Sequence, residues 1–212
     1  MLENRSFLSL QRWLSKNILA QLLGGALLLS GCNGHSKVEA TIAGVSLGEA
    51  KFAFFGRAEG LGVDLDGNDI NDATATLVVA ITDKRSFCRD MDNLSITDNI
   101  EELGEAQLLL VNANLFAADT DDSPLQGGVV IQQGDTIDVN LGYQSFVDSA
   151  VAASAANTLD DVVLTVKRIN FERLAGSLTA TLVDGGVDVI VDGDFVANHC
   201  PGLDNAALTG GL

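Results

Sequence analysis

Short runs of apolar and β-branched residues, separated by glycine, aspartate, asparagine and serine, follow one another along the chain from residue 38 onward. Long stretches with the 3.6-residue period of an amphipathic helix are few, and alternation of apolar and polar residues is typical of strands. The pattern predicts strands over residues 38–45, 51–55, 73–82, 106–115, 129–132, 136–145, 162–171, 174–183 and 187–196. Short helical segments are expected only over residues 95–103 and 148–156. We therefore predict an all-β protein, an antiparallel β-sandwich of about nine strands, in a single domain over residues 38–212.

The clearest pattern is a hairpin near the C-terminus. Residues 174–180 are echoed by residues 190–197, and both segments contain the motif Gly-x-apolar-x-Ala. Asp184, Gly185 and Gly186 stand between them and suit a tight turn that needs positive φ angles. Alternation then predicts which side chains face the core. The inward set is Leu178, Leu182, Val189, Val191 and Phe195, and the outward set is Asp188, Asp192 and Asp194.

The N-terminal segment has the three-part layout of a secretory signal. Basic residues precede an apolar run of 12 residues at 18–29, which is shorter than the roughly 20 residues that a membrane-spanning helix needs. The run ends in Leu29-Ser30-Gly31-Cys32, which resembles the lipobox of bacterial lipoproteins. The resemblance implies that residues 1–31 are cleaved, that Cys32 carries the lipid on its sulfur, and that residues 32–37 form a tether. It also favours the outer membrane, because residue 33 is Asn33 and not the aspartate that favours inner-membrane retention.

Net charge limits the partners of the cleaved chain. Residues 1–31 hold three of the 12 basic and one of the 29 acidic residues, so the remainder carries a formal charge of −19. Such a charge repels phosphate backbones and anionic head groups, which argues against nucleic acid and against adsorption of the protein body to lipid. Membrane attachment is therefore expected to come from the acyl chains on Cys32, since two or more chains anchor a protein stably.

Two cysteines remain once Cys32 is assigned to the lipid. In an exported chain Cys88 and Cys200 most simply form a disulfide, which would close a span of 112 residues and stabilise the fold by about 4–5 kcal/mol in the chain-entropy estimate. Two free thiols are the alternative. A metal or redox site is less favoured, because neither cysteine lies in a C-x-x-C pair.

The repeated motif near the C-terminus is similar to one in a diffuse group of uncharacterised bacterial lipoproteins. Its two copies are Gly176-x-Leu178-x-Ala180 and Gly193-x-Phe195-x-Ala197, and they close on Cys200. In that group the cysteine has a partner that follows an early strand, the place that Cys88 occupies here. The resemblance implies β-hairpins and a disulfide, and it implies no activity.

An acidic loop is the best candidate for a cation site. Asp64, Asp66, Asn68 and Asp72 match the first, third, fifth and ninth positions of an EF-hand loop, and oxygen ligands at alternate positions suit Ca²⁺. The sixth and twelfth positions, Asp69 and Ala75, depart from the glycine and glutamate of that motif. The alternative is a solvated turn between strands.

Ser46 offers a second, weaker candidate. It lies in Gly44-Val45-Ser46-Leu47-Gly48, which has the G-x-S-x-G form of a hydrolase nucleophile elbow, and His199 follows later in the chain. That mechanism requires a strand-to-helix turn, whereas the residues after Ser46 predict another strand. A serine in a β-turn is the simpler interpretation.

These observations predict a non-catalytic, lipid-anchored protein of the cell envelope with a binding or structural role and no cofactor. A protein or a glycan is the expected kind of partner. One alternative is a calcium-dependent adhesion or recognition module that uses Asp64 to Asp72, and another is a small serine hydrolase that uses Ser46.

Overall fold

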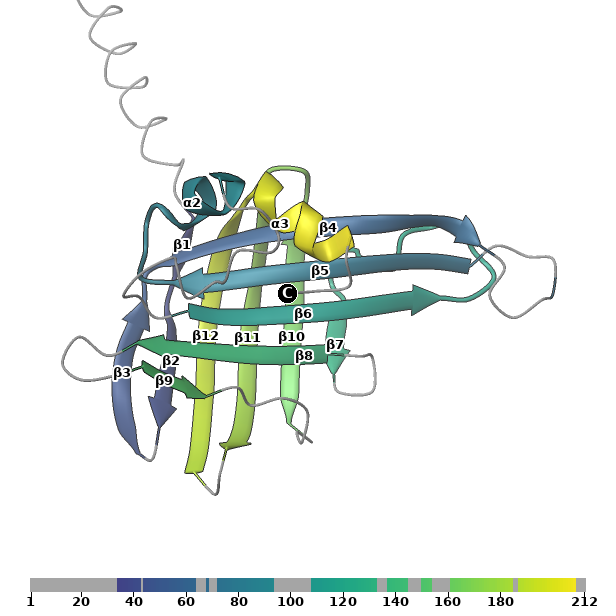
Figure 1. The fold of residues 1–212 in the computed structure, drawn as a ribbon. Coiled ribbons are helices and arrows are strands. Elements are labelled where there is room, and N and C mark those ends of the chain that lie inside the picture. The colour runs from purple at the N-terminus through teal and green to yellow at the C-terminus, as the bar shows by residue number, and fades with distance from the viewer. Residues whose placement is uncertain are drawn as a thin grey trace, which may run out of the picture. The chain divides into compact units, whose positions relative to one another are not determined.

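Twelve strands and two short helices form over the residues that the computed structural model describes (Figure 1). These are residues 34–42, 44–63, 68, 72–93, 108–132, 137–144, 150–153, 161–184 and 187–208. The strands are β1 (His35–Ser36), β2 (Val38–Ile42), β3 (Val45–Ala50), β4 (Phe52–Val63), β5 (Asp72–Thr82), β6 (Leu108–Ala117), β7 (Val130–Gln132), β8 (Ile137–Gln144), β9 (Ala150–Ala153), β10 (Val162–Ile169), β11 (Arg173–Asp184) and β12 (Val187–His199). The helices are α2 (Phe87–Asn93) and α3 (Pro201–Leu208). The predicted all-β class is confirmed.

The predicted elements differ from the observed ones in several places. The strand expected over 38–45 is two strands, β2 and β3, because the chain turns at Gly44, whose φ is +79°. The helix expected over 148–156 is wrong: β9 lies there and pairs with β8, with Val151 opposite Tyr143. Cross-strand pairing thus outweighs the helix propensity of that alanine-rich segment. The helix expected over 95–103 lies outside the described residues, and α2 and α3 were not expected.

All the strands belong to one hydrogen-bonded sheet, which is mixed, because one pair of strands runs parallel where all pairs were expected to be antiparallel. The order is β7-β10-β11-β12-β4-β5-β6-β8-β9, with β1 and β2 also paired to β12 and with β3 paired to β2. The strands pair antiparallel except β4 and β12, which run parallel where Asn198 and His199 lie opposite Phe54 and Phe55. Beyond this junction the strands β4, β5, β6 and β8 cross over β10, β11 and β12 as a second layer (Figure 1).

The main core lies between the two layers. Its largest fully buried side chains come from both of them: Phe55, Leu77 and Ile81 from β4 and β5, and Leu164, Leu174 and Leu178 from β10 and β11. The predicted hairpin is formed by β11 and β12. Its inward residues Leu178, Val189, Val191 and Phe195 are buried and its three aspartates Asp188, Asp192 and Asp194 are exposed, as predicted. The side chain of Leu182 lies outside the described residues.

The repeated glycine motif has a cross-strand explanation. Gly176 lies opposite Phe195, and Gly193 lies opposite Leu178, so each glycine faces the large residue of the other copy. A Cβ atom at Gly176 would lie 2.9 Å from Cζ of Phe195, which is too close for van der Waals contact. The two copies therefore complement each other across one hairpin.

A second, smaller apolar cluster covers the other face of β4, β5 and β6. It consists of strand residues beneath α2 and α3, the helix residues above them, and the nearby cysteine: Phe54, Val78, Ala80, Leu108, Leu110, Phe87, Met91, Leu203, Ala207 and Cys200. Helix α3 comes so close to β4 that a Cβ at Gly56 would lie 2.3 Å from the backbone carbon of Leu203. Neither helix of the described part is long and apolar enough to cross a membrane.

Candidate functional site

The folded domain begins nearer to Cys32 than the sequence suggested. Gly34 is buried, and a Cβ atom on it would lie 2.2 Å from the carbonyl oxygen of Ala53 and 2.9 Å from the amide nitrogen of Asn198. His35 and Ser36 then pair with β12 as strand β1. Residues 34–37, expected to be a tether, are therefore part of the fold. Cys32 and residues 1–31 lie outside the described residues.

The predicted disulfide is present between Cys88 and Cys200. Their sulfur atoms lie 2.28 Å apart and their Cα atoms 5.5 Å apart. Cys88 comes from α2, and Cys200 follows β12 directly, with its N–H donating to the carbonyl of Phe55 at 2.8 Å. The bond thus ties α2 to the end of β12 across 112 residues of sequence.

Of the predicted calcium ligands, Asn68 and Asp72 are among the described residues, and both contact the turn after β6. The carboxylate of Asp72 is buried and accepts the N–H of Asp119 at 2.9 Å. The side-chain amide of Asn68 donates to the carboxylate of Asp119 at 2.8 Å. Asp119 itself has a φ of +59°, a conformation that aspartate tolerates better than most residues. Both predicted ligands therefore help to hold the turn that contains Asp119.

The calcium hypothesis stays a prediction, because Asp64 and Asp66 lie outside the described residues. Within the described ranges, no three histidine, cysteine, aspartate or glutamate side chains are grouped in a way that could hold a metal ion. Asp119, which both described residues contact, was not among the predicted ligands. No local signal links it to Asp72, which lies 47 residues earlier.

Ser46 lies in the hairpin between β2 and β3 and is exposed. Its hydroxyl donates to the carboxylate of Glu39 and accepts the N–H of Gly48 at 3.1 Å. Ser46 pairs with Thr41, which pairs with Ile190 on β12, nine residues before His199. At the rise of an extended strand, those nine residues span about 30 Å. The structure therefore does not bring the serine and the histidine of the hydrolase hypothesis together.

His199 belongs instead to a polar cluster at the end of β12. Its Nε2 lies 2.8 Å from Oδ2 of Asp204 on α3, and its ring lies 5.5 Å from that of Phe55. The same carboxylate accepts the backbone N–H of Arg57 at 2.9 Å through Oδ1. Asp204 therefore takes the place of a neighbouring strand where β12 stops pairing with β4.

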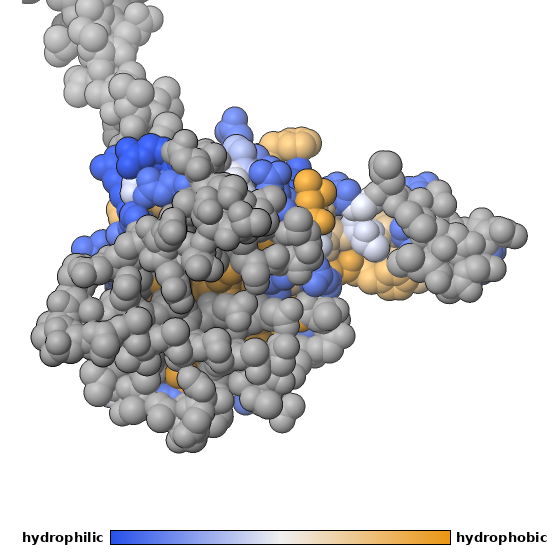
Figure 2. All heavy atoms as spheres, in the orientation of Figure 1, coloured by the Kyte–Doolittle hydropathy of each residue, from blue (hydrophilic) through white to orange (hydrophobic). Residues whose placement is uncertain are grey.

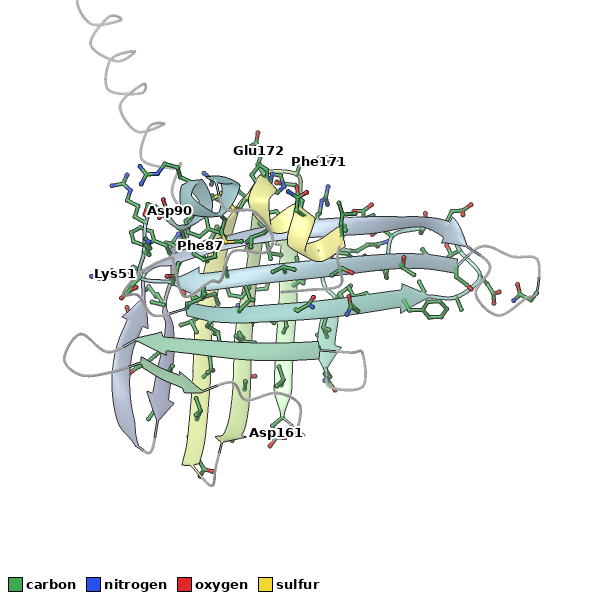
Figure 3. The ribbon with its side chains drawn as sticks, viewed as in Figure 1. Lys51, Phe87, Asp90, Asp161, Phe171 and Glu172 are labelled. Atoms are coloured by element: carbon green, nitrogen blue, oxygen red, sulfur yellow. A yellow bond between two sulfur atoms is a disulfide. The ribbon has the colours of Figure 1, made fainter. Side chains whose placement is uncertain are left out.

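Arg57 points from this cluster toward an exposed aromatic residue. Its guanidinium lies 4.6 Å from the centre of the Phe171 ring, a distance at which a cation is attracted to an aromatic face. Its Nη1 also lies 3.4 Å from the carboxylate of Glu59. Phe171, in the turn between β10 and β11, is 81% exposed, the largest exposed fraction of any large apolar side chain in the described part. Figure 3 labels it beside Glu172, at the same end of the molecule as the two helices.

A groove of about 610 Å³ opens beside this pair. It is lined by the middle of β4, the loop before β7 and the β10–β11 turn: Arg57, Glu59, Leu125, Gln126, Gly127, Ile169, Asn170 and Phe171. An apolar base with a few polar groups and a charged residue is the usual composition of a small-ligand site. Sequence reasoning missed it because its three segments lie far apart in the chain and none carries a motif.

Comparison of the chain with protein-family models, with curated proteins and with solved structures gave no match.

Proposed function

We propose that the chain is an exported lipoprotein, cleaved before Cys32, whose folded domain acts at the cell envelope by binding or as a structural part. The observation that supports export is the disulfide between Cys88 and Cys200. Disulfides form and persist in oxidising compartments outside the cytosol. The lipobox-like residues Leu29 to Cys32 independently indicate the same route.

A binding or structural role is supported by what the side chains of the hydrolase hypothesis do in the fold. Ser46 is hydrogen-bonded to Glu39, and the pair of His199 and Asp204 holds the edge of β4. These contacts give both groups a structural task. The groove beside Arg57 and Phe171 offers a surface of the size that small ligands occupy.

The outer membrane is the proposed address, because Asn33 follows the lipidated cysteine. The acyl chains on Cys32 would hold the domain at the membrane surface, since a protein with more than one buried acyl chain stays bound.

The test compares the wild-type chain with a Cys32→Ala variant, both produced from the full sequence in a Gram-negative bacterium. Mass spectrometry of the wild-type protein should find a chain that begins at a diacylated Cys32 and partitions with outer-membrane vesicles. The variant should lose the lipid and leave the membrane fraction. A wild-type product that retains residues 1–31, or a Cys32→Ala protein that stays equally membrane-bound, would contradict the proposal.

Export is tested separately by trapping free thiols in intact cells. Cys88 and Cys200 should resist alkylation before reduction and react after it. Deleting residues 2–31 provides the matched control, because a chain retained in the cytosol should expose both thiols to the reagent. Free thiols in the full-length product would remove the main support for export.

A further inference from the structure

The distance between the lipid and the fold is very short. Only Asn33 separates Cys32 from Gly34, and Gly34 is already packed between Ala53 and Asn198. Two residues of extended chain reach at most about 7 Å. A lipid on Cys32 would therefore hold the surface around Gly34 close to the membrane.

The basic residues of the domain gather at this same end. Of the nine lysines and arginines that follow residue 33, seven lie near the last part of β12 or near the helices next to it: Arg57, Lys84, Arg85, Arg89, Lys167, Arg168 and Arg173. The strand pairings place them there. Arg173 lies opposite Asn198, and Arg168 lies opposite Ala175, which pairs with Val196. The helical members surround α2, which the disulfide joins to Cys200. Figure 2 shows the hydrophilic groups over α2.

The opposite end of the same strands is acidic. Asp188 and Asp192 are exposed at the start of β12, and Glu39 and Glu49 lie opposite Asp192 on successive strands. Asp161 precedes β10 at that end, far from Phe171 and Glu172 in Figure 3. Asp192 and His199 are separated by seven residues of β12, or about 23 Å at the strand rise. At a Debye length of about 10 Å, these carboxylates are largely screened from whatever the basic end contacts.

The basic end also carries the most exposed apolar side chain. Phe171 projects from the β10–β11 turn between Arg168 and Arg173, beside Glu172. This turn lies about two strand spacings from Gly34, or about 10 Å, because Arg173 and Gly34 flank Asn198 from opposite sides. Aromatic residues beside arginine and lysine are typical of segments that lie at a membrane–water interface.

We propose that this basic end is a membrane-docking surface, with Phe171 entering the headgroup region of an anionic bilayer and the acidic end directed away from it. The inference rests on the proposed lipid anchor at Cys32 and extends it by fixing the orientation of the domain. The net charge of the whole chain disfavours adsorption to lipid. The potential of an anionic membrane, however, acts mainly on charges close to the membrane surface, and basic residues there are attracted to it. Carboxylates lie at this end too: Glu59 is paired with Arg57, Asp90 with Lys84 and Arg89, and Asp194 with Lys167, while Asp83, Glu172 and Asp204 lie nearby. Arg168 and Arg173, which flank the Phe171 turn, are both exposed.

The chain offers a clean reporter of this orientation. Its one tryptophan is Trp13, which is removed with residues 1–31, so a Phe171→Trp variant has a single tryptophan after processing. Phe116→Trp is the matched control, since Phe116 is also exposed but lies near the end of β6 opposite Thr74. Each lipidated protein would be purified from membranes and reconstituted on vesicles of phosphatidylcholine, with or without phosphatidylglycerol. Brominated lipid in the bilayer quenches tryptophan that enters it.

We expect the emission of Trp at position 171 to shift to shorter wavelength and to be quenched, more strongly with phosphatidylglycerol and less in high salt, while Trp at position 116 stays unquenched. Adding Arg168→Glu and Arg173→Glu to the Phe171→Trp protein should relieve the quenching. The matched double change Asp188→Lys and Asp192→Lys at the acidic end should leave the quenching in place.

The possible failures are distinguishable by floating the vesicles. A protein that floats with the vesicles but keeps Trp at position 171 unquenched, or quenches Trp at position 116 equally, overturns the docking surface and leaves the anchor intact. A protein that carries no lipid and does not float overturns the proposed function itself. Circular dichroism of each variant verifies that the fold is retained.

Discussion

The two faces of β4, β5 and β6 are buried in different ways. The inner face packs against the other layer of the sheet, with Leu77 fully buried. The outer face is covered by two short helices, and the disulfide joins α2 to the chain just before α3. Val78, the next residue on β5, is as fully buried there as Leu77 is on the inner face. The inner face is covered by several strands that are hydrogen-bonded to one another. The outer face is covered by helices of seven and eight residues, and helices this short are not stable by themselves.

Of the changes considered for the two faces, loss of the disulfide is expected to lower the free energy of unfolding most. The double change Cys88→Ala and Cys200→Ala avoids leaving a free thiol and should lower the free energy of unfolding by about 4–5 kcal/mol, because the bond closes a long loop. Urea unfolding followed by circular dichroism measures the loss. Amide exchange should rise first in α2 and the outer cluster. Uniform exchange over both faces would mean that the two clusters unfold as one unit.

Truncation of neighbouring residues on β5 compares the two faces directly. Leu77→Ala should cost about 3 kcal/mol, because it leaves a cavity between two sheet layers that cannot collapse. Val78→Ala removes fewer atoms beneath helices that can move inward, and should cost about 1–2 kcal/mol. Thermal unfolding of both variants decides the order. A larger loss for Val78→Ala would show that the helix-covered face is the more rigid one.

The contact that ends the pairing of β12 with β4 predicts a smaller effect. Asp204→Ala removes the acceptor of the Arg57 N–H and the partner of His199, and should lower stability by about 1–2 kcal/mol. Asp204→Asn keeps an oxygen acceptor for the N–H and should recover about half of the loss. Equal losses for both variants would assign the effect to the charge and not to the hydrogen bond.

The smallest expected effect concerns Asp90 on α2 and its dependence on pH. The hydrogen bond from Ser86 and then the one from Lys84 lower the pKa of this carboxyl below its ordinary value of 3.8. The stabilisation is therefore complete above that ordinary pKa and is lost as the pH falls through the lowered one. Asp90→Asn should unfold at the same temperature as the wild type in strong acid and at a slightly lower one near neutrality. A constant difference at all pH values would contradict this assignment.

Alternation in the sequence was enough to predict the inner core but not the outer one. Phe195, Val191 and Val189 repeat every second residue, so their burial and the exposure of the aspartates between them could be predicted. Residues such as Val78 and Ala80 are also buried, on the other face of β5, so that strand has no polar side to interpret. The two helices that cover this face could not be predicted, because each is too short to show the periodic pattern of an amphipathic helix. The groove beside Arg57 could not be predicted, because distant segments form it.

The contacts at the end of β12 also limit how another strand could pair with the edge of β4 beyond Phe55. Asp204 occupies the first N–H that a further strand would use, and the register with β5 shifts between Gly60 and Val63. An incoming strand would therefore find only Ala58 to Gly60 in regular register, which is too short for stable pairing. Edges blunted in this way resist stacking into fibrils. The carboxylate of Asp204 on α3 thereby shortens the part of this edge that another strand could pair with.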